Sequence, residues 1–182
     1  MNRPATLTGT AAALALALAT LAAGSAVAQT VVSLVPPSGT FQCEETWTID
    51  VMVDAGATDL RGCSLVVAFD DDVIRPLSVT AGALIAGAAC PNFTHWFGPT
   101  AADSVAFDVA ALGCSVSGPG SVARITFEGY IGGTTPITLR RGDLRTGLNE
   151  TIPFTAIDAQ VHYDCAVEAQ RWNWGSVKAT YR

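Results

Sequence analysis

Histidine and lysine are nearly absent from this sequence. It contains two histidines, His95 and His162, and one lysine, Lys178. No H-x-H or H-E-x-x-H metal spacing occurs, and there is no G-x-S-x-G nucleophile elbow. Two separated histidines and acids in turns cannot supply a nucleophile, a base and an orienting group. The sequence therefore predicts a protein that is not an enzyme and that needs no metal or cofactor.

Basic residues are few relative to acidic ones. Lys and Arg together number 10 against 16 Asp and Glu, a formal net charge of −6. Nucleic acids and anionic membranes are bound through clustered Lys and Arg that neutralise phosphate. This acidic chain is therefore not expected to bind either of them.

Long apolar runs are confined to the first 28 residues. Arg3 precedes an uncharged Ala- and Leu-rich run over 11–23, and Ala26-Val27-Ala28 stands before Gln29. This is the order of a secretory signal peptide. The alternative is an uncleaved anchor helix, but the run is shorter than the roughly 20 apolar residues that a span requires. We expect cleavage after Ala28, a secreted or cell-surface location, and no membrane insertion afterwards.

The remaining chain has the length of one domain with a hydrophobic core. We expect a folded domain over residues 29–165 and a tail over 166–182 that contains Trp172 and Trp174. All five cysteines follow the predicted cleavage site, where an oxidising compartment lets disulfides persist. Their odd number leaves one cysteine unpaired.

Alternation of apolar and polar residues recurs along residues 29–165 and predicts strands with one buried face. The clearest segments are 47–54, 63–69, 105–109, 123–128 and 157–163, with shorter β-prone pieces at 31–35, 73–79 and 136–139. Turn residues cluster between them at 36–39, 56–59, 118–120, 132–134 and 141–143. The pattern predicts an all-β sandwich of about eight or nine strands, with one weak helix candidate at 81–89.

Several of these segments, taken in order, resemble the cohesin domain. The matching pieces are Val31–Leu34, Ile49–Val53, Leu60–Asp70, Gly118–Phe127 and Ile157–Val161. They are spread from Gln29 to about Tyr163, which is nearly the whole chain after the predicted cleavage site. The resemblance implies a nine-stranded, antiparallel-rich jelly roll related to carbohydrate-binding modules. It also implies a dockerin-like protein partner, which in the family is a calcium-loaded module that attaches polysaccharide-degrading enzymes to a scaffold or surface.

The segment Cys90–Pro99 holds the candidate binding residues. We interpret it as a loop bounded by Pro and Gly, whose aromatic side chains could stack on a sugar ring or form a hot spot for a protein. Alternatively, the rings close one end of the sandwich core. The candidates are Asn92, Phe93, His95, Trp96 and Phe97.

Three shorter features have weaker interpretations. Asp70-Asp71-Asp72 could offer oxygen ligands to calcium, but the spaced D-x-D-x-D-G pattern is missing, so an acidic turn is favoured. Arg141-Gly142-Asp143 spells an adhesion tripeptide, for which a simple turn is the preferred interpretation. His162 falls on the polar face of its strand and is expected to be solvated.

The cysteine pairing can be proposed in two steps. Cys90 and Cys114 flank the strand predicted around residues 105–111, so a bridge there would staple the aromatic segment to the next turn. The cohesin resemblance implies parallel first and last strands, which would bring Cys43 near Cys165. Cys63 alternates in phase with buried positions and is expected to be an unreactive thiol.

These observations favour a secreted, non-catalytic binding module that engages a dockerin-like protein, in a setting of polysaccharide breakdown. One alternative is a carbohydrate-binding module that contacts glycan directly through the aromatic segment. Another is a structural component of the cell surface.

Overall fold

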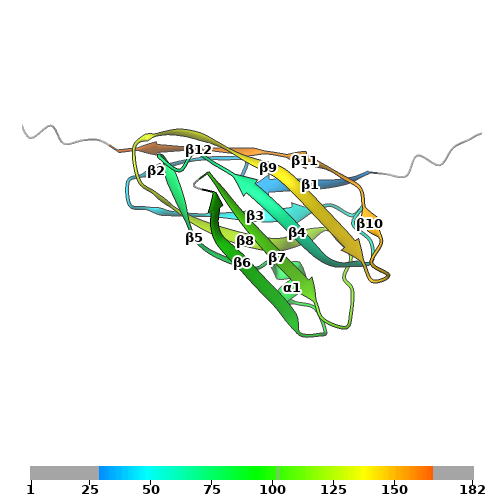
Figure 1. Cartoon of the computed structure of the whole chain (residues 1–182). Helices are drawn as coiled ribbons and strands as arrows, with labels where there is room; N and C mark the ends of the chain where they lie inside the picture. The colour runs from blue at the N-terminus through cyan, green and yellow to red at the C-terminus, as the bar shows by residue number, and fades with distance from the viewer. Residues whose placement is uncertain (1–28, 102, 166–182) are drawn as a thin grey trace, which may run out of the picture.

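Two β-sheets stack face to face in the computed structural model, which describes residues 29–101 and 103–165 (Figure 1). The predicted all-β sandwich is therefore confirmed. The predicted signal peptide (1–28) and tail (166–182) lie outside the described residues. Within the described part of the chain, no helix is long and apolar enough to cross a membrane.

The smaller sheet, here called the back sheet, has five strands in the order β11-β1-β3-β8-β5. Its strands are β1 (Thr30–Val35), β3 (Thr46–Val53), β5 (Ile74–Ala81), β8 (Gly120–Gly129) and β11 (Phe154–Ile157). The larger front sheet has seven strands; six follow the order β2-β12-β9-β4-β7-β6, and β10 pairs with β9. Its strands are β2 (Ser38–Gln42), β4 (Leu60–Ala68), β6 (Asn92–Ala101), β7 (Ser104–Ala111), β9 (Gly133–Thr146), β10 (Thr151–Ile152) and β12 (Ala159–Asp164).

The core lies between the sheets and follows the period-two pattern of the sequence. In β3, Ile49 and Val51 are fully buried, while Asp50 between them and Thr48 and Met52 on either side are not. Phe107 of β7 and Phe127 of β8 are also fully buried and face each other's sheets. Burying a side chain of this size stabilises the fold by about 1.5–3 kcal/mol, so this pattern specifies which face of each strand points inward. The weak helix candidate is reduced to α1 (Ala83–Ala86).

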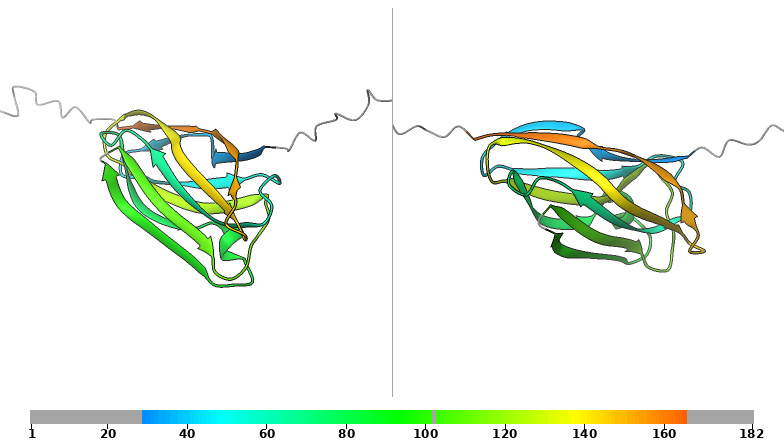
Figure 2. Two further views of the ribbon diagram at one scale, coloured as in Figure 1. Left: turned by 45° about the vertical axis from the view of Figure 1, so that its right-hand side comes forward. Right: turned by 45° about the horizontal axis from the view of Figure 1, so that its top comes forward.

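Near each end of the described chain, the backbone crosses from the back sheet to the front sheet. The two crossing segments lie side by side. β1 pairs in parallel with β11 in the back sheet, and β2 pairs in parallel with β12 in the front sheet. The break in the first strand falls at Pro36-Pro37, where two backbone N–H donors are missing. Figure 2 shows these blue and orange segments running together along one border of the sandwich. Because the terminal strands are divided in this way, the structure has more strand segments than the eight or nine expected.

The prediction of a turn at Arg141-Gly142-Asp143 is wrong. β9 runs straight through this tripeptide, with Arg141 opposite Val66 and Asp143 opposite Ser64 of β4. Gly142 is needed for close packing, since a Cβ there would lie 2.7 Å from Leu65 Cδ2 and would also strike the Phe154 ring. The glycine that suggested a turn therefore leaves room for the Leu65 and Phe154 side chains. Likewise, β2 begins at Ser38, inside another predicted turn.

Candidate docking face

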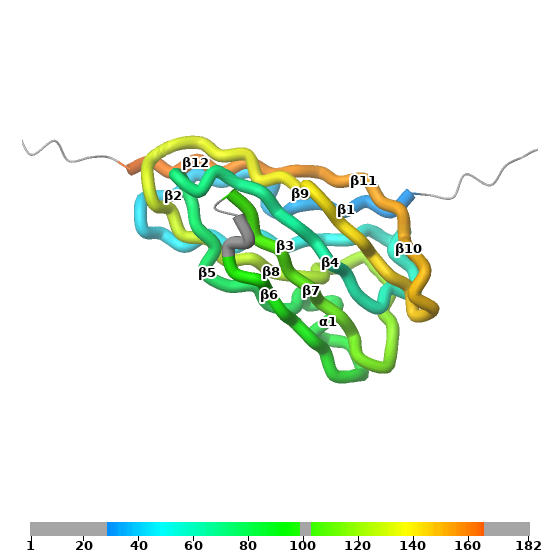
Figure 3. The backbone as a smooth tube through the Cα atoms, in the orientation of Figure 1, coloured from blue at the N-terminus to red at the C-terminus, as the bar shows by residue number. Residues whose placement is uncertain are grey.

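The segment predicted to be an aromatic loop is instead a strand, β6, at the border of the front sheet. It pairs antiparallel with β7, from Asn92 opposite Ala111 to Phe97 opposite Ala106. Proline and glycine at 98–99 suggested a loop, but Pro99 is tolerated because it lies on an edge strand, where one side of the backbone has no ladder partner. The tube in Figure 3 shows β6 as the outermost strand beside β7.

Three of the five candidate side chains form a ridge on the outer surface of β6. Phe93, His95 and Phe97 alternate along the strand, and the two phenylalanines are 46% and 44% exposed. The Phe93 and His95 ring centroids are 6.3 Å apart with nearly parallel planes, and those of His95 and Phe97 are 4.5 Å apart with planes at 87°. We call Phe93, His95 and Phe97 the aromatic ridge.

The other two candidates do not belong to the ridge. Trp96 lies opposite Phe107 and packs against the core while remaining partly exposed. Asn92 is exposed at the first position of β6. The two interpretations of this segment therefore apply to different residues: Trp96 closes the core, and the ridge faces solvent.

Beside the ridge, the outer surface of β7 and β4 has a floor of small side chains, and β9 supplies a charged border. Each ridge residue begins a cross-strand row over β7, β4 and β9. The rows are Phe93–Ala110–Gly62–Arg145, His95–Asp108–Ser64–Asp143 and Phe97–Ala106–Val66–Arg141. We call this outer surface of β6, β7, β4 and β9 the front face.

Three arginines lie at this side of the front face, Arg141 and Arg145 on β9 and Arg61 at the start of β4. Arg145 forms an ion pair with Asp143 at 2.6 Å, and Arg61 donates to the Gly147 carbonyl at 3.4 Å. Arg141 is exposed, and it forms no ion pair with any described residue. A guanidinium of this kind is available to bind a carboxylate of another molecule.

A shallow hollow of about 310 Å³ lies between the ridge and the border, with Phe93 on one side and Arg61 and Arg145 on the other. Gly62 is part of its floor, and a Cβ there would lie 2.8 Å from the Val109 carbonyl oxygen. Beneath the floor, burial raises the pKa of the Cys63 thiol to about 12, with a smaller contribution from the negative charge of Asp108. Cys63 is therefore a neutral packing residue and not a nucleophile.

Two disulfides hold the strands that frame this face. Cys90, just before β6, is bonded to Cys114, which follows β7, with Cα atoms 6.0 Å apart. Cys43, after β2, is bonded to Cys165, after β12, with Cα atoms 4.9 Å apart. Cys63 is free and buried. These are the pairs and the free thiol named from the sequence, and the first pair staples β6 to its neighbour.

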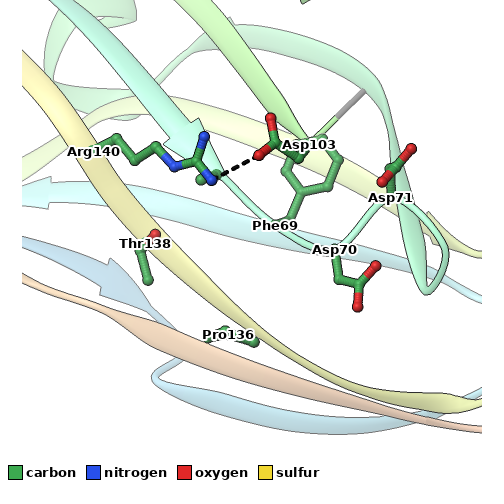
Figure 4. A pocket seen from close by; sticks show the side chains of 8 residues that line it. Phe69, Asp70, Asp71, Asp103, Pro136, Thr138 and Arg140 are labelled. Carbon is green, nitrogen blue, oxygen red and sulfur yellow. Dashed lines mark hydrogen bonds and ion pairs between the residues drawn. The ribbon is translucent and has the colours of Figure 1, made fainter. Parts of the chain in front are cut away.

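The acidic turn after β4 borders a second hollow, of about 340 Å³ (Figure 4). Asp103 is bound to Arg140 at 2.7 Å, and this hydrogen bond lowers the pKa of the Asp103 carboxyl. The Asp70 backbone N–H donates to Thr135 Oγ1, and its carboxylate accepts the Asp72 N–H. In Figure 4 the carboxylates of Asp70, Asp71 and Asp103 do not converge on a common point. No group of three His, Cys, Asp or Glu in the described residues could hold a metal ion.

His162 is exposed on the outer surface of β12, as the sequence suggested. Its Nδ1 lies 2.7 Å from Thr134 Oγ1. Together with Ser38, Thr40 and Gln160 these residues line a polar groove of about 440 Å³. The groove lies far along the sheet from the ridge, because β9, β4 and β7 separate β12 from β6.

No protein-family model matches this sequence, and no curated protein does. Solved structures match it closely in shape. A non-cellulosomal cohesin from the archaeon Archaeoglobus fulgidus gives a TM-score of 0.63 at 15% identity, over 78% of this chain and 96% of that one. A type II cohesin domain from the cellulosome of Acetivibrio cellulolyticus gives 0.63 at 16% identity, over 73% and 95%.

A third match is a chain of a type I cohesin–dockerin complex from Clostridium thermocellum. Its TM-score is 0.60 at 9% identity, over 75% of this chain and 99% of that one. The sandwich is thus cohesin-like, as the sequence resemblance implied. At these identities the likeness concerns the fold, and function has to be argued from the surface.

Proposed function

We propose that this chain is an exported, non-catalytic module whose front face binds a protein partner, and that the partner is dockerin-like. The aromatic ridge beside the small-residue floor is the observation that carries the proposal. Several chains with the same fold were solved in complex with dockerins. Export, and a setting of polysaccharide breakdown, are part of this proposal.

The chemistry of the front face suits a protein interface. Protein hot spots combine aromatic anchors that become fully desolvated with a polar surround that stays wet. Phe93 and Phe97 provide nearly half-exposed rings, while Arg141 and Arg145 provide the polar surround on β9. The floor between them carries only short side chains, so a helix or strand of a partner can approach the sheet closely.

Ring orientation argues against direct glycan stacking on the ridge. A sugar ring is held when an aromatic face lies flat against it, and a longer glycan needs several coplanar faces in line. The plane of Phe97 is turned by 87° from that of His95, so these neighbouring rings do not share a platform. A partner with an irregular surface of side chains fits the ridge better than a flat polysaccharide.

Calorimetric titration with calcium-loaded type I and type II dockerins tests the proposal. We expect at least one to bind, and the double change Phe93→Ala with Phe97→Ala to weaken binding at least tenfold. The control is Leu77→Ala on β5, which removes an equally exposed apolar side chain from the back sheet and should change affinity less than twofold.

The glycan alternative is tested in parallel by retention on insoluble polysaccharides. Retention that is lost in the Phe93/Phe97 double variant but kept in Leu77→Ala would replace the protein partner with a carbohydrate. Export is tested separately by amino-terminal sequencing of protein recovered outside the cell, where a start at Gln29 is expected.

A further inference from the structure

We infer that two copies of this chain pair through β6, antiparallel and centred on His95, so that their front sheets join into one continuous sheet. The free border of β6 is enough for this pairing, which does not require a partner on the front face, although Phe93 and Phe97 take part in both. The four sheet borders differ in their protection against such pairing, and the side chains of β6 match those of a second copy.

Three of the four sheet borders carry protection against pairing with another strand, as natural edge strands usually do. β5 has Pro76, a register shift beside it and the ion pair of Arg75 with Glu128. β11 has four residues, and β2 has five between Pro37 and the disulfide-bonded Cys43.

β6 lacks this protection over residues 92–97. The strand has ten residues, its register shifts begin only after Phe97, and it carries no acidic or basic residue apart from His95. Among the described residues no strand pairs with its outer border, which forms the margin of the molecule in both views of Figure 2. Two copies would bring no Asp, Glu, Lys or Arg of β6 together, although the whole chain has a net charge of −6.

The side chains of β6 complement those of a second copy. In an antiparallel pair centred on His95, Phe93 of each copy lies opposite Phe97 of the other. Cross-strand aromatic pairs of this kind stabilise sheets. The pairing brings four phenylalanine rings, each 44–46% exposed in one copy, into side-by-side contact, and it does so with the same residues on both sides, as a two-fold interface requires.

The border is also held in shape before pairing. The Cys90–Cys114 disulfide fixes the open end of the β6–β7 hairpin, with Cα atoms 6.0 Å apart. A strand that is already extended and anchored loses little conformational freedom when it gains a partner. This favours pairing of the folded protein over exchange of strands between copies.

Cysteine cross-linking tests the register. Directly opposite residues in an antiparallel pair have Cα atoms about 4.5–5.5 Å apart, within the range for a disulfide. His95→Cys should therefore form a covalent dimer under mild oxidation. Phe93→Cys alone should not, since two copies of residue 93 would lie about 13 Å apart. A mixture of Phe93→Cys with Phe97→Cys should cross-link as a heterodimer.

Sedimentation of the unmodified protein measures the association, with a concentration-dependent dimer expected. His95→Lys should weaken dimerisation at least tenfold, because the new lysines oppose each other, while Asp108 beside each preserves the fold. His95→Gln is the neutral control and should dimerise within threefold of the unmodified protein.

A monomer at all concentrations, or equal cross-linking of Phe93→Cys and His95→Cys, would overturn the inference. Neither result would bear on partner binding, which is measured by titration with a dockerin. Conversely, absence of dockerin binding would leave the dimer measurement unaffected.

Discussion

The Cα atoms of Cys43 and Cys165 lie 4.9 Å apart although 122 positions separate the two residues. They meet because β2 and β12 run in parallel, with Gln42 opposite Asp164, so both strands end at the same end of the front sheet. The disulfide therefore closes nearly the whole domain into one loop, and it ties the end of β2 to the end of the last strand, β12.

Removing this disulfide should be costly. Closing a loop of this length stabilises by about 5 kcal/mol in the chain-entropy account, and the shorter Cys90–Cys114 loop by about 3.4. We expect the double change Cys43→Ser and Cys165→Ser to lower the free energy of unfolding in urea by more than the Cys90→Ser and Cys114→Ser pair does. Non-reducing peptide mapping checks the pairing itself: a peptide that joins Cys63 to any other cysteine would contradict it.

Cys63 should resist alkylation in the native protein and react only on unfolding. Burial raises the pKa of its thiol from 9.0 to about 12, so at pH 8 almost no thiolate is present. Mass spectrometry after iodoacetamide treatment, with and without urea, measures this. Labelling of the native protein at the rate of a free thiol would show that Cys63 is accessible.

The same pKa difference predicts a pH dependence of stability. Above about pH 9 the unfolded chain loses the Cys63 proton while the folded chain keeps it until about pH 12, so the free energy of unfolding falls across this range. Tyr163, whose pKa burial raises from 10.0 to about 12, acts in the same direction from about pH 10. Cys63→Ala should flatten the curve between pH 9 and 10 in particular.

Gly142→Ala should destabilise the domain by about 1–3 kcal/mol, because the added methyl group overlaps the buried Leu65 side chain and the partly buried Phe154 ring, both of which have to shift. Gly98→Ala on β6 is the matched control, since nothing lies within 4 Å of a Cβ there. It should change stability by less than about 0.5 kcal/mol. Equal effects of the two changes would contradict the packing around β9.

The difference between these two glycines explains where sequence interpretation failed. In isolation, Gly142 between Arg141 and Asp143 and Gly98 before Pro99 both resemble turns. The structure instead places both in strands. At Gly142 a side chain would meet the Phe154 ring, so glycine fits there. Gly98 and Pro99 are tolerated because β6 is an edge strand. Neither cause is local in sequence, so only the tertiary contacts reveal it.

Burial patterns were easier to predict, because period-two alternation reflects a single physical requirement, a buried face. The alternation around Ile49, Phe107 and Ile125 predicted the inward faces that the structure has. The same rule, applied to Phe93-Thr94-His95-Trp96-Phe97, would have predicted a strand with the ridge on one face and Trp96 on the other. The neighbouring Pro and Gly concealed this signal.

Trp96 and Phe97 are neighbours on opposite faces of β6, so truncating Trp96 should mainly reduce stability and truncating Phe97 should mainly reduce binding. Trp96→Ala removes a ring packed against the core and should lower the free energy of unfolding by about 2–4 kcal/mol, somewhat less than for a fully buried tryptophan because part of its surface is exposed. Phe97→Ala removes a ring that is 44% exposed and should cost less than about 1 kcal/mol.

Urea unfolding of the two variants, monitored by far-ultraviolet circular dichroism, measures both costs on the same strand. Binding measured on the folded variants should reverse the order, with Phe97→Ala impairing the front face and Trp96→Ala affecting it only through loss of folded protein. If Trp96→Ala leaves stability unchanged and abolishes binding, then Trp96 belongs to the contact surface, and the orientation of β6 described above is wrong.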